Sequence, residues 1–115
     1  MSLDVYLYID VDTGGEKKER VYLYEDNITH NLGKMATKAE IYNVLWRPKD
    51  IYAERAKDII DQLSEGLRCL KEFPDYFKGF NSPNGWGLYE HFVPFVENYL
   101  EACKKHPKAL IGVSR

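Results

Sequence analysis

The sequence predicts an α+β fold in which a small antiparallel sheet is covered on one face by several helices. The sheet would consist of an N-terminal hairpin and a C-terminal strand. Two observations support this prediction: residues near both chain ends alternate with a period of two, strictly so in residues 4–11, and apolar residues recur at helical spacing between them. The length of 115 residues suits a single domain, 1–115, with one core.

The N-terminal hairpin is predicted from residues 4–11 and 21–24, which both alternate with a period of two. Residues 12–15 form a turn, and a charged run before the second strand lengthens the loop. If the aliphatic side packs on helices, four tyrosines share the opposite face of the sheet: Tyr6, Tyr8, Tyr22 and Tyr24.

This tyrosine face has two interpretations. Tyrosine is common in strands, and cross-strand aromatic pairs stabilise sheets by themselves. Alternatively, the rings form a binding surface, because tyrosine offers a large and rigid contact area with a polar tip. Exposed aromatic clusters often mark contacts with other molecules. The sequence leaves both interpretations open.

The middle of the chain is predicted to be helical. Residues 27–39 are expected as one short helix and residues 40–46 as another helix or turn. After a break at residues 47–50, apolar spacing indicates a helix from about residue 51 to residue 72. Residues 74–80 are expected as a helical turn.

The C-terminal third is the most strongly patterned part of the chain. A turn at residues 82–85 precedes an apolar stripe at helical spacing, which runs from Tyr89 to Cys103. Pro94 should kink or restart this helix, because proline has no N–H to donate. Residues 108–115 alternate again and are expected to add a last strand to the hairpin.

Composition limits the possible partners. The net charge of −2 gives no basic surplus for a nucleic-acid backbone. No apolar run approaches the roughly 20 residues that cross a bilayer, and no signal peptide is recognisable. We therefore expect a cytoplasmic protein that binds neither nucleic acid nor membrane. Cys69 and Cys103 are expected as free thiols.

No motif indicates catalysis or a cofactor. The serines lack a nucleophile-elbow context, the three histidines stand alone, and no phosphate-binding loop or metal-ligand spacing occurs. We expect no catalytic residue, no metal and no cofactor. Whether the protein is an enzyme stays open at this point, with a non-catalytic protein favoured.

One polar group could still line a pocket. It combines four residues at a predicted helix start with three at other element ends: Asn27, Thr29, His30, Asn31, Trp46, Arg47 and Trp86. A nucleotide-like or anionic metabolite could find amides, an imidazole, indoles and a guanidinium there. His30 would be the natural acid or base, since histidine titrates near neutral pH. Alternatively, these residues cap helices, fill the core and pair with acids.

Several runs carry a family resemblance: DVYLY, NITHNLGKMA, LWRP and FNSPNGWGLYEHFVPFVENYLEACKKHP. They resemble a family of small uncharacterised proteins encoded by tailed phages, prophages and some bacteria, over most of the chain. The resemblance implies a phage-type accessory protein acting in a host cytoplasm, and it implies no particular activity.

The leading hypothesis is therefore a non-catalytic binding protein that engages a host protein through the tyrosine face. The same face could instead pair two copies of this chain in a homodimer. The alternative is a small-ligand or hydrolytic module that uses the polar group around His30.

Overall fold

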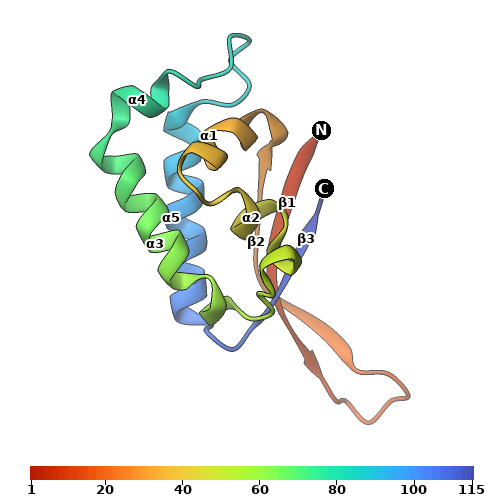
Figure 1. The fold of residues 1–115 in the computed structure, drawn as a ribbon. Coiled ribbons are helices and arrows are strands. Elements are labelled where there is room, and N and C mark those ends of the chain that lie inside the picture. Colours follow the sequence, from red (N-terminus) through yellow and green to blue (C-terminus); the bar gives the residue numbers. More distant parts are fainter.

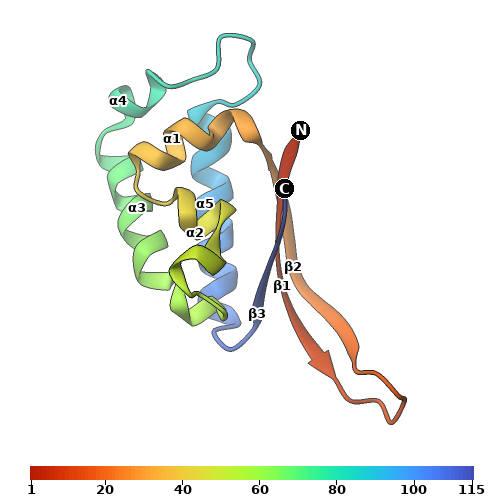
Figure 2. The same ribbon diagram turned by 45° about the vertical axis from the view of Figure 1, so that its right-hand side comes forward.

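The structure is a computed structural model that describes residues 1–115. A three-stranded antiparallel sheet, ordered β2–β1–β3, carries the helices on one face and leaves the other face open (Figure 1, Figure 2). The strands are β1 (Ser2–Val11), β2 (Glu19–Thr29) and β3 (Leu110–Ser114). This confirms the predicted α+β class, including the addition of the C-terminal strand to the hairpin.

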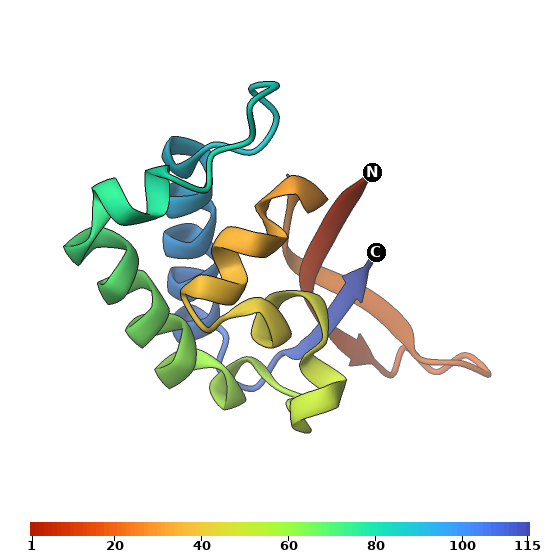
Figure 3. The same ribbon diagram turned by 45° about the horizontal axis from the view of Figure 1, so that its top comes forward.

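All helices lie in the connection between the hairpin and β3, and they form a layer on one side of the sheet, which Figure 3 shows with its top tilted forward. The 3₁₀ helices are η1 (His30–Leu32), η2 (Pro48–Ile51) and η3 (Ala56–Asp58). The α-helices are α1 (Gly33–Lys38), α2 (Tyr42–Trp46), α3 (Ile60–Glu72), α4 (Pro74–Lys78) and α5 (Tyr89–Lys105).

One hydrophobic core of 26 buried residues joins the sheet to the helices. Leu3, Val5 and Leu7 of β1 are fully buried in this core, which also contains Phe92 and Tyr99 of α5. The helix α5 runs through Pro94 without a restart although proline removes one backbone hydrogen bond, and the apolar residues on both sides of it, Phe92 and Phe95, are buried in the same core. The predicted restart is therefore wrong.

The hairpin reaches well past the helical layer (Figure 1, Figure 2). Its outer part, near the turn after β1, has no helix opposite it. As a result Ile9 and Val21, which pair across the strands on the helix-facing side, are 38% and 42% exposed.

The predicted helix 27–39 is wrong in its first part. The strand β2 continues to Thr29, because its pairing with β1 extends to the register Ser2↔Thr29 and buries Ile28. Asn27 therefore caps no helix; its Nδ2 donates to Asp4 Oδ1 across the strands at 2.7 Å. Long-range pairing with β1 overrides the local capping preference.

The predicted helix 51–72 begins only at Ile60. The residues before Ile60 lie along the edge of the sheet, where Arg55 forms an antiparallel bridge with Leu110 of β3. Asp58 Oδ2 accepts the backbone N–H groups of Glu54 and Arg55 at 3.0 and 2.9 Å and fixes this segment. No helix of the structure is both long and apolar enough to span a membrane.

Candidate functional site

Three tyrosines form a connected aromatic cluster on the open face of the sheet. The ring centroid of Tyr6 lies 5.9 Å from that of Tyr8 and 5.5 Å from that of Tyr22, in an edge-to-face arrangement with the latter. The rings of Tyr8 and Tyr22 are 6.5 Å apart. These distances lie within the range in which aromatic rings attract one another. Because each ring contacts two others, the cluster is ordered before any partner arrives.

Arg20 belongs to this cluster, although no sequence pattern singles it out. Its guanidinium carbon lies 3.9 Å from the ring centroid of Tyr8, in a cation–π contact. Asp10, which is opposite Arg20 in the hairpin, adds an ion pair at 3.7 Å. The surface therefore combines rigid phenol rings with a guanidinium whose position is fixed by the Tyr8 ring and the Asp10 carboxylate.

The cluster depends on a glycine in the neighbouring strand. Gly112 of β3 pairs with Tyr6, and a Cβ at this position would lie only 2.0 Å from Cε2 of the Tyr6 ring. The ring thus lies flat across the backbone of β3, where only glycine leaves room for it. We define the tyrosine face as Tyr6, Tyr8, Arg20, Tyr22 and Gly112.

Tyr24 lies on the opposite face, contrary to the sequence-based prediction. The register shifts between Leu7 and Tyr8: Tyr22 pairs with Tyr8, whereas Tyr24 pairs with the buried Leu7. Leu23 is therefore the extra residue of a β-bulge, which reverses the side on which the following residues lie.

On the helix-facing side, Tyr24 stacks on Tyr99 of α5 with centroids 6.0 Å apart. Burial raises the pKa of the Tyr24 phenol above its usual value, and the neighbouring Asp26 carboxylate adds to this. Burial likewise raises the pKa of Tyr99, whose hydroxyl has no hydrogen-bond partner. Both phenols therefore serve the core and stay neutral.

The polar residues singled out in the sequence meet in part. A shallow pocket of about 1040 Å³ at the start of β1 is lined by Asn27, Thr29, His30, Asn31 and Trp86. Asn84 and His91 also line it; Asn84 belongs to the same predicted turn region as Trp86, whereas no pattern in the sequence marks His91.

The indole of Trp86 is 71% exposed on a loop that is hydrogen-bonded at several points. The Trp86 backbone N–H donates to Asn84 Oδ1 at 2.9 Å, and the Trp86 carbonyl accepts Nδ2 of Asn31 at 2.7 Å. Gly87, at φ +118°, lets the loop pack against Asn31, since a Cβ there would lie 2.9 Å from the Asn31 Cβ. The loop therefore holds a large aromatic side chain in solvent at a defined place.

Trp46 supports His30 from the core and does not line this pocket. The indole is buried, stacks on Tyr42 at 5.1 Å, and donates its Nε1–H to His30 Nδ1 at 2.8 Å. Because Nδ1 accepts this bond, the neutral imidazole carries its proton on Nε2. His30 can therefore offer an N–H donor at the pocket.

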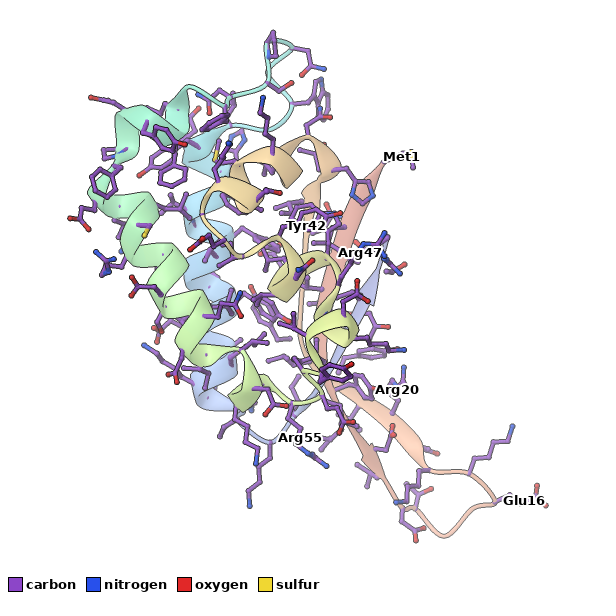
Figure 4. The ribbon with its side chains drawn as sticks, in the orientation of Figure 1. Met1, Glu16, Arg20, Tyr42, Arg47 and Arg55 are labelled. Atoms are coloured by element: carbon purple, nitrogen blue, oxygen red, sulfur yellow. The ribbon has the colours of Figure 1, made fainter.

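Arg47 does not join the group. It lies beside β3 with an exposed side chain and lines a different hollow (Figure 4). Much of the remaining group also has a structural role. Thr29 Oγ1 accepts the N–H of Asn31 at 3.3 Å as the cap of η1, and Asn27 binds Asp4.

No other constellation in the structure suggests chemistry. No group of three or more His, Cys, Asp and Glu residues is arranged to hold a metal ion. Cys69 and Cys103 are free, and burial raises the pKa of Cys103 to about 12, so its thiol is not a nucleophile at neutral pH.

Comparisons with protein-family models, with curated proteins and with solved structures give no match to this chain.

Proposed function

We propose that this protein is a non-catalytic binding protein that engages another protein through the tyrosine face. The observation that carries the proposal is the connected surface of three tyrosines and Arg20 on a sheet face that no helix of the chain covers. Tyrosine and arginine are the residue types, together with tryptophan, that are most enriched at the energetic centres of protein interfaces.

The physical chemistry of the face favours binding over a purely structural role. The core lies on the other side of the sheet, where Leu3, Val5 and Leu7 are fully buried. Tyr22 remains 50% exposed, so apolar ring surface is still available to a partner. Since the rings already constrain one another, binding would order few side chains and lose little entropy.

The expected setting follows from the family resemblance. We propose a phage-type accessory protein that acts in the cytoplasm of its host, with a host protein as partner and with no cofactor. A second copy of this chain is the other partner that the same surface could accept.

The test is affinity capture from a lysate of the bacterial host, followed by mass spectrometry. The variant Tyr8→Ala/Tyr22→Ala removes exposed contact area, whereas Tyr24 is left in place because it packs on the core. Tyr76→Ala is the matched control, since Tyr76 is 55% exposed on α4, far from the sheet. The partner should be retained by the wild type and the control and lost with the double variant.

Circular dichroism has to show that both variants fold, and sedimentation of the purified protein separates a host partner from self-association. Retention of the same proteins by all three forms would remove the proposal.

A second candidate is a small-ligand module, because five of the seven polar residues do line one pocket with an exposed Trp86. A nucleotide-like ligand could stack on the indole and accept the Nε2–H of His30. Thermal-shift screening with nucleotides and anionic metabolites should then give a stabilisation that His30→Gln and Trp86→Ala both abolish. No shift with any compound removes this candidate.

A further inference from the structure

We propose that the outer edge of β3, beside the tyrosine face, receives an extended acidic segment of the partner protein as an added β-strand. This inference rests on the proposed function, since it names the chemistry of the partner. Four observations support it. A short segment of this chain already pairs with the outer edge of β3, and that pairing stops before the end of β3. A hollow lies along the remaining edge, and the charged side chains that line this hollow are mainly basic.

The N-terminal part of the outer edge of β3 is already paired with another segment of this chain. The Ile111 N–H donates to the Glu54 carbonyl at 3.0 Å, and the Ala56 N–H donates to the Ala109 carbonyl at 2.9 Å. Together with the antiparallel bridge between Arg55 and Leu110, these bonds form the beginning of a fourth strand. The outer edge of β3 can therefore form the backbone hydrogen bonds of a β-sheet.

The segment of this chain around Arg55 stops pairing with β3 just where its next hydrogen bonds to β3 would form. Tyr52 takes a left-handed conformation, at φ 58°, and its N–H donates to the Lys49 carbonyl at 3.1 Å. The Ala53 N–H likewise bonds back to the Pro48 carbonyl at 3.0 Å, within the same turn. The residues just before this segment are therefore folded into η2, and the C-terminal part of the outer edge of β3 has no strand beside it.

The backbone groups of Val113 face this gap. Since the Ile111 N–H points outward to Glu54, alternation along the strand points the N–H and carbonyl of Val113 to the same outer side. Val113 is therefore opposite Val5 on the inner side as a non-hydrogen-bonded pair. An incoming strand would satisfy both groups, as in β-strand addition to an exposed sheet edge.

A hollow of about 700 Å³ runs along this edge. Tyr6 and Tyr8 line it from the open face of the sheet, while Trp46 and Pro48 line it from the helical side. Side chains of an added strand point alternately to the two faces. The hollow therefore offers aromatic contacts to one set of side chains and the η2 wall to the other.

The charge of the hollow selects the partner. Its four basic side chains, Arg20, Arg47, Lys49 and Arg115, outnumber the two acidic ones, Asp50 and Glu54. This is a local basic excess on a chain whose net charge is −2. Only Arg20 among the four takes part in an ion pair of the structure. Three cations are thus left for carboxylates of the partner, which favours an acidic segment.

The experiment selects binders from a library of short random peptides displayed on phage, with the wild-type protein as bait. Enriched peptides should carry a net negative charge. On binding a synthetic copy of one, the amide of Val113 should exchange its hydrogen more slowly, which NMR measures residue by residue.

Charge-reversal variants supply the control. Arg47→Glu/Arg115→Glu should weaken binding of that peptide by about tenfold or more. Lys17→Glu/Lys18→Glu makes the same change in net charge in the exposed hairpin loop and should leave binding unchanged. Equal affinity in both variants would attribute the effect to net charge alone and overturn the inference.

The inference also fails if no peptide is enriched, if enriched peptides are not acidic, or if they bind without protecting Val113. The proposed function would survive any of these results, provided that the tyrosine variants still lose the partner in lysate. If the tyrosine variants keep that partner, the proposed function fails by itself.

Discussion

Replacing Gly112 by alanine tests the architecture of the tyrosine face without removing any of its side chains. The new Cβ would lie 2.0 Å from Cε2 and 2.3 Å from Cζ of Tyr6. Carbon atoms in contact prefer about 3.5–4.0 Å, so the ring would have to move by about 1.5 Å or more. The move also disturbs the edge-to-face contact of Tyr6 with Tyr22.

The magnitude follows from two opposing effects. Overpacking costs about 1–3 kcal/mol, whereas removing glycine from a strand gains about 0.5–1 kcal/mol. The net free energy of unfolding should therefore fall by up to about 2.5 kcal/mol in Gly112→Ala, as measured by urea denaturation.

A double-mutant cycle shows whether the ring is the cause. In a Tyr6→Ala background the clash is absent, so Gly112→Ala should be neutral or slightly stabilising. The coupling free energy between the two positions should equal the overpacking cost, about 1–3 kcal/mol. Additive effects of the two substitutions would refute the reasoning, because the Tyr6 ring would then not lie over β3.

Two further predictions concern the core and the edge segment. Tyr99→Phe removes a buried hydroxyl that has no hydrogen-bond partner, so urea denaturation should show equal stability or a gain of up to about 1–3 kcal/mol; a clear loss would mean that the hydroxyl has a partner. Asp58→Ala removes the acceptor of two backbone N–H groups and should cost about 1 kcal/mol at pH 7. Those bonds lower the pKa of Asp58 in the folded state. Its contribution is therefore present above the unfolded pKa of about 3.9 and is lost as the pH falls through the lower folded value. A difference between wild type and variant that does not shrink in acid would contradict this assignment.

Much of the fold could be predicted from local patterns because both periodicities are strong. Alternation placed β1 and β3, and helical spacing placed α5, since in each case one face of the element is buried by its neighbours. Patterns failed where a distant partner decides the conformation. Residues 27–29 extend β2 because β1 is there to pair with them, and no property of a short polar run announces that pairing.

The β-bulge at Leu23 can be predicted from the sequence once the second strand is taken to extend as far as Ile28. Val21 and Ile28 both face the helical side, yet they are an odd number of residues apart. Strict alternation cannot place both residues inward, so a strand spanning them requires one extra residue. Tyr24 follows that residue, which is why it packs on the core.

The polar group was predicted in part for similar reasons. Trp46 and Arg47 are adjacent at a helix end, and adjacent residues of a helix do not face the same way. Their separation was therefore accessible from the sequence. The hydrogen bond between Trp46 and His30 joins residues 16 positions apart, and only the fold brings them together.

The most direct test of the central claim is photo-crosslinking in host cells, with p-benzoylphenylalanine in place of single tyrosines. At Tyr22 the probe lies on the tyrosine face, and at Tyr76 it is equally exposed on α4. The account predicts a discrete crosslinked product with a second protein from Tyr22→p-benzoylphenylalanine and none from Tyr76→p-benzoylphenylalanine. Products from both positions alike, or from neither, would contradict it.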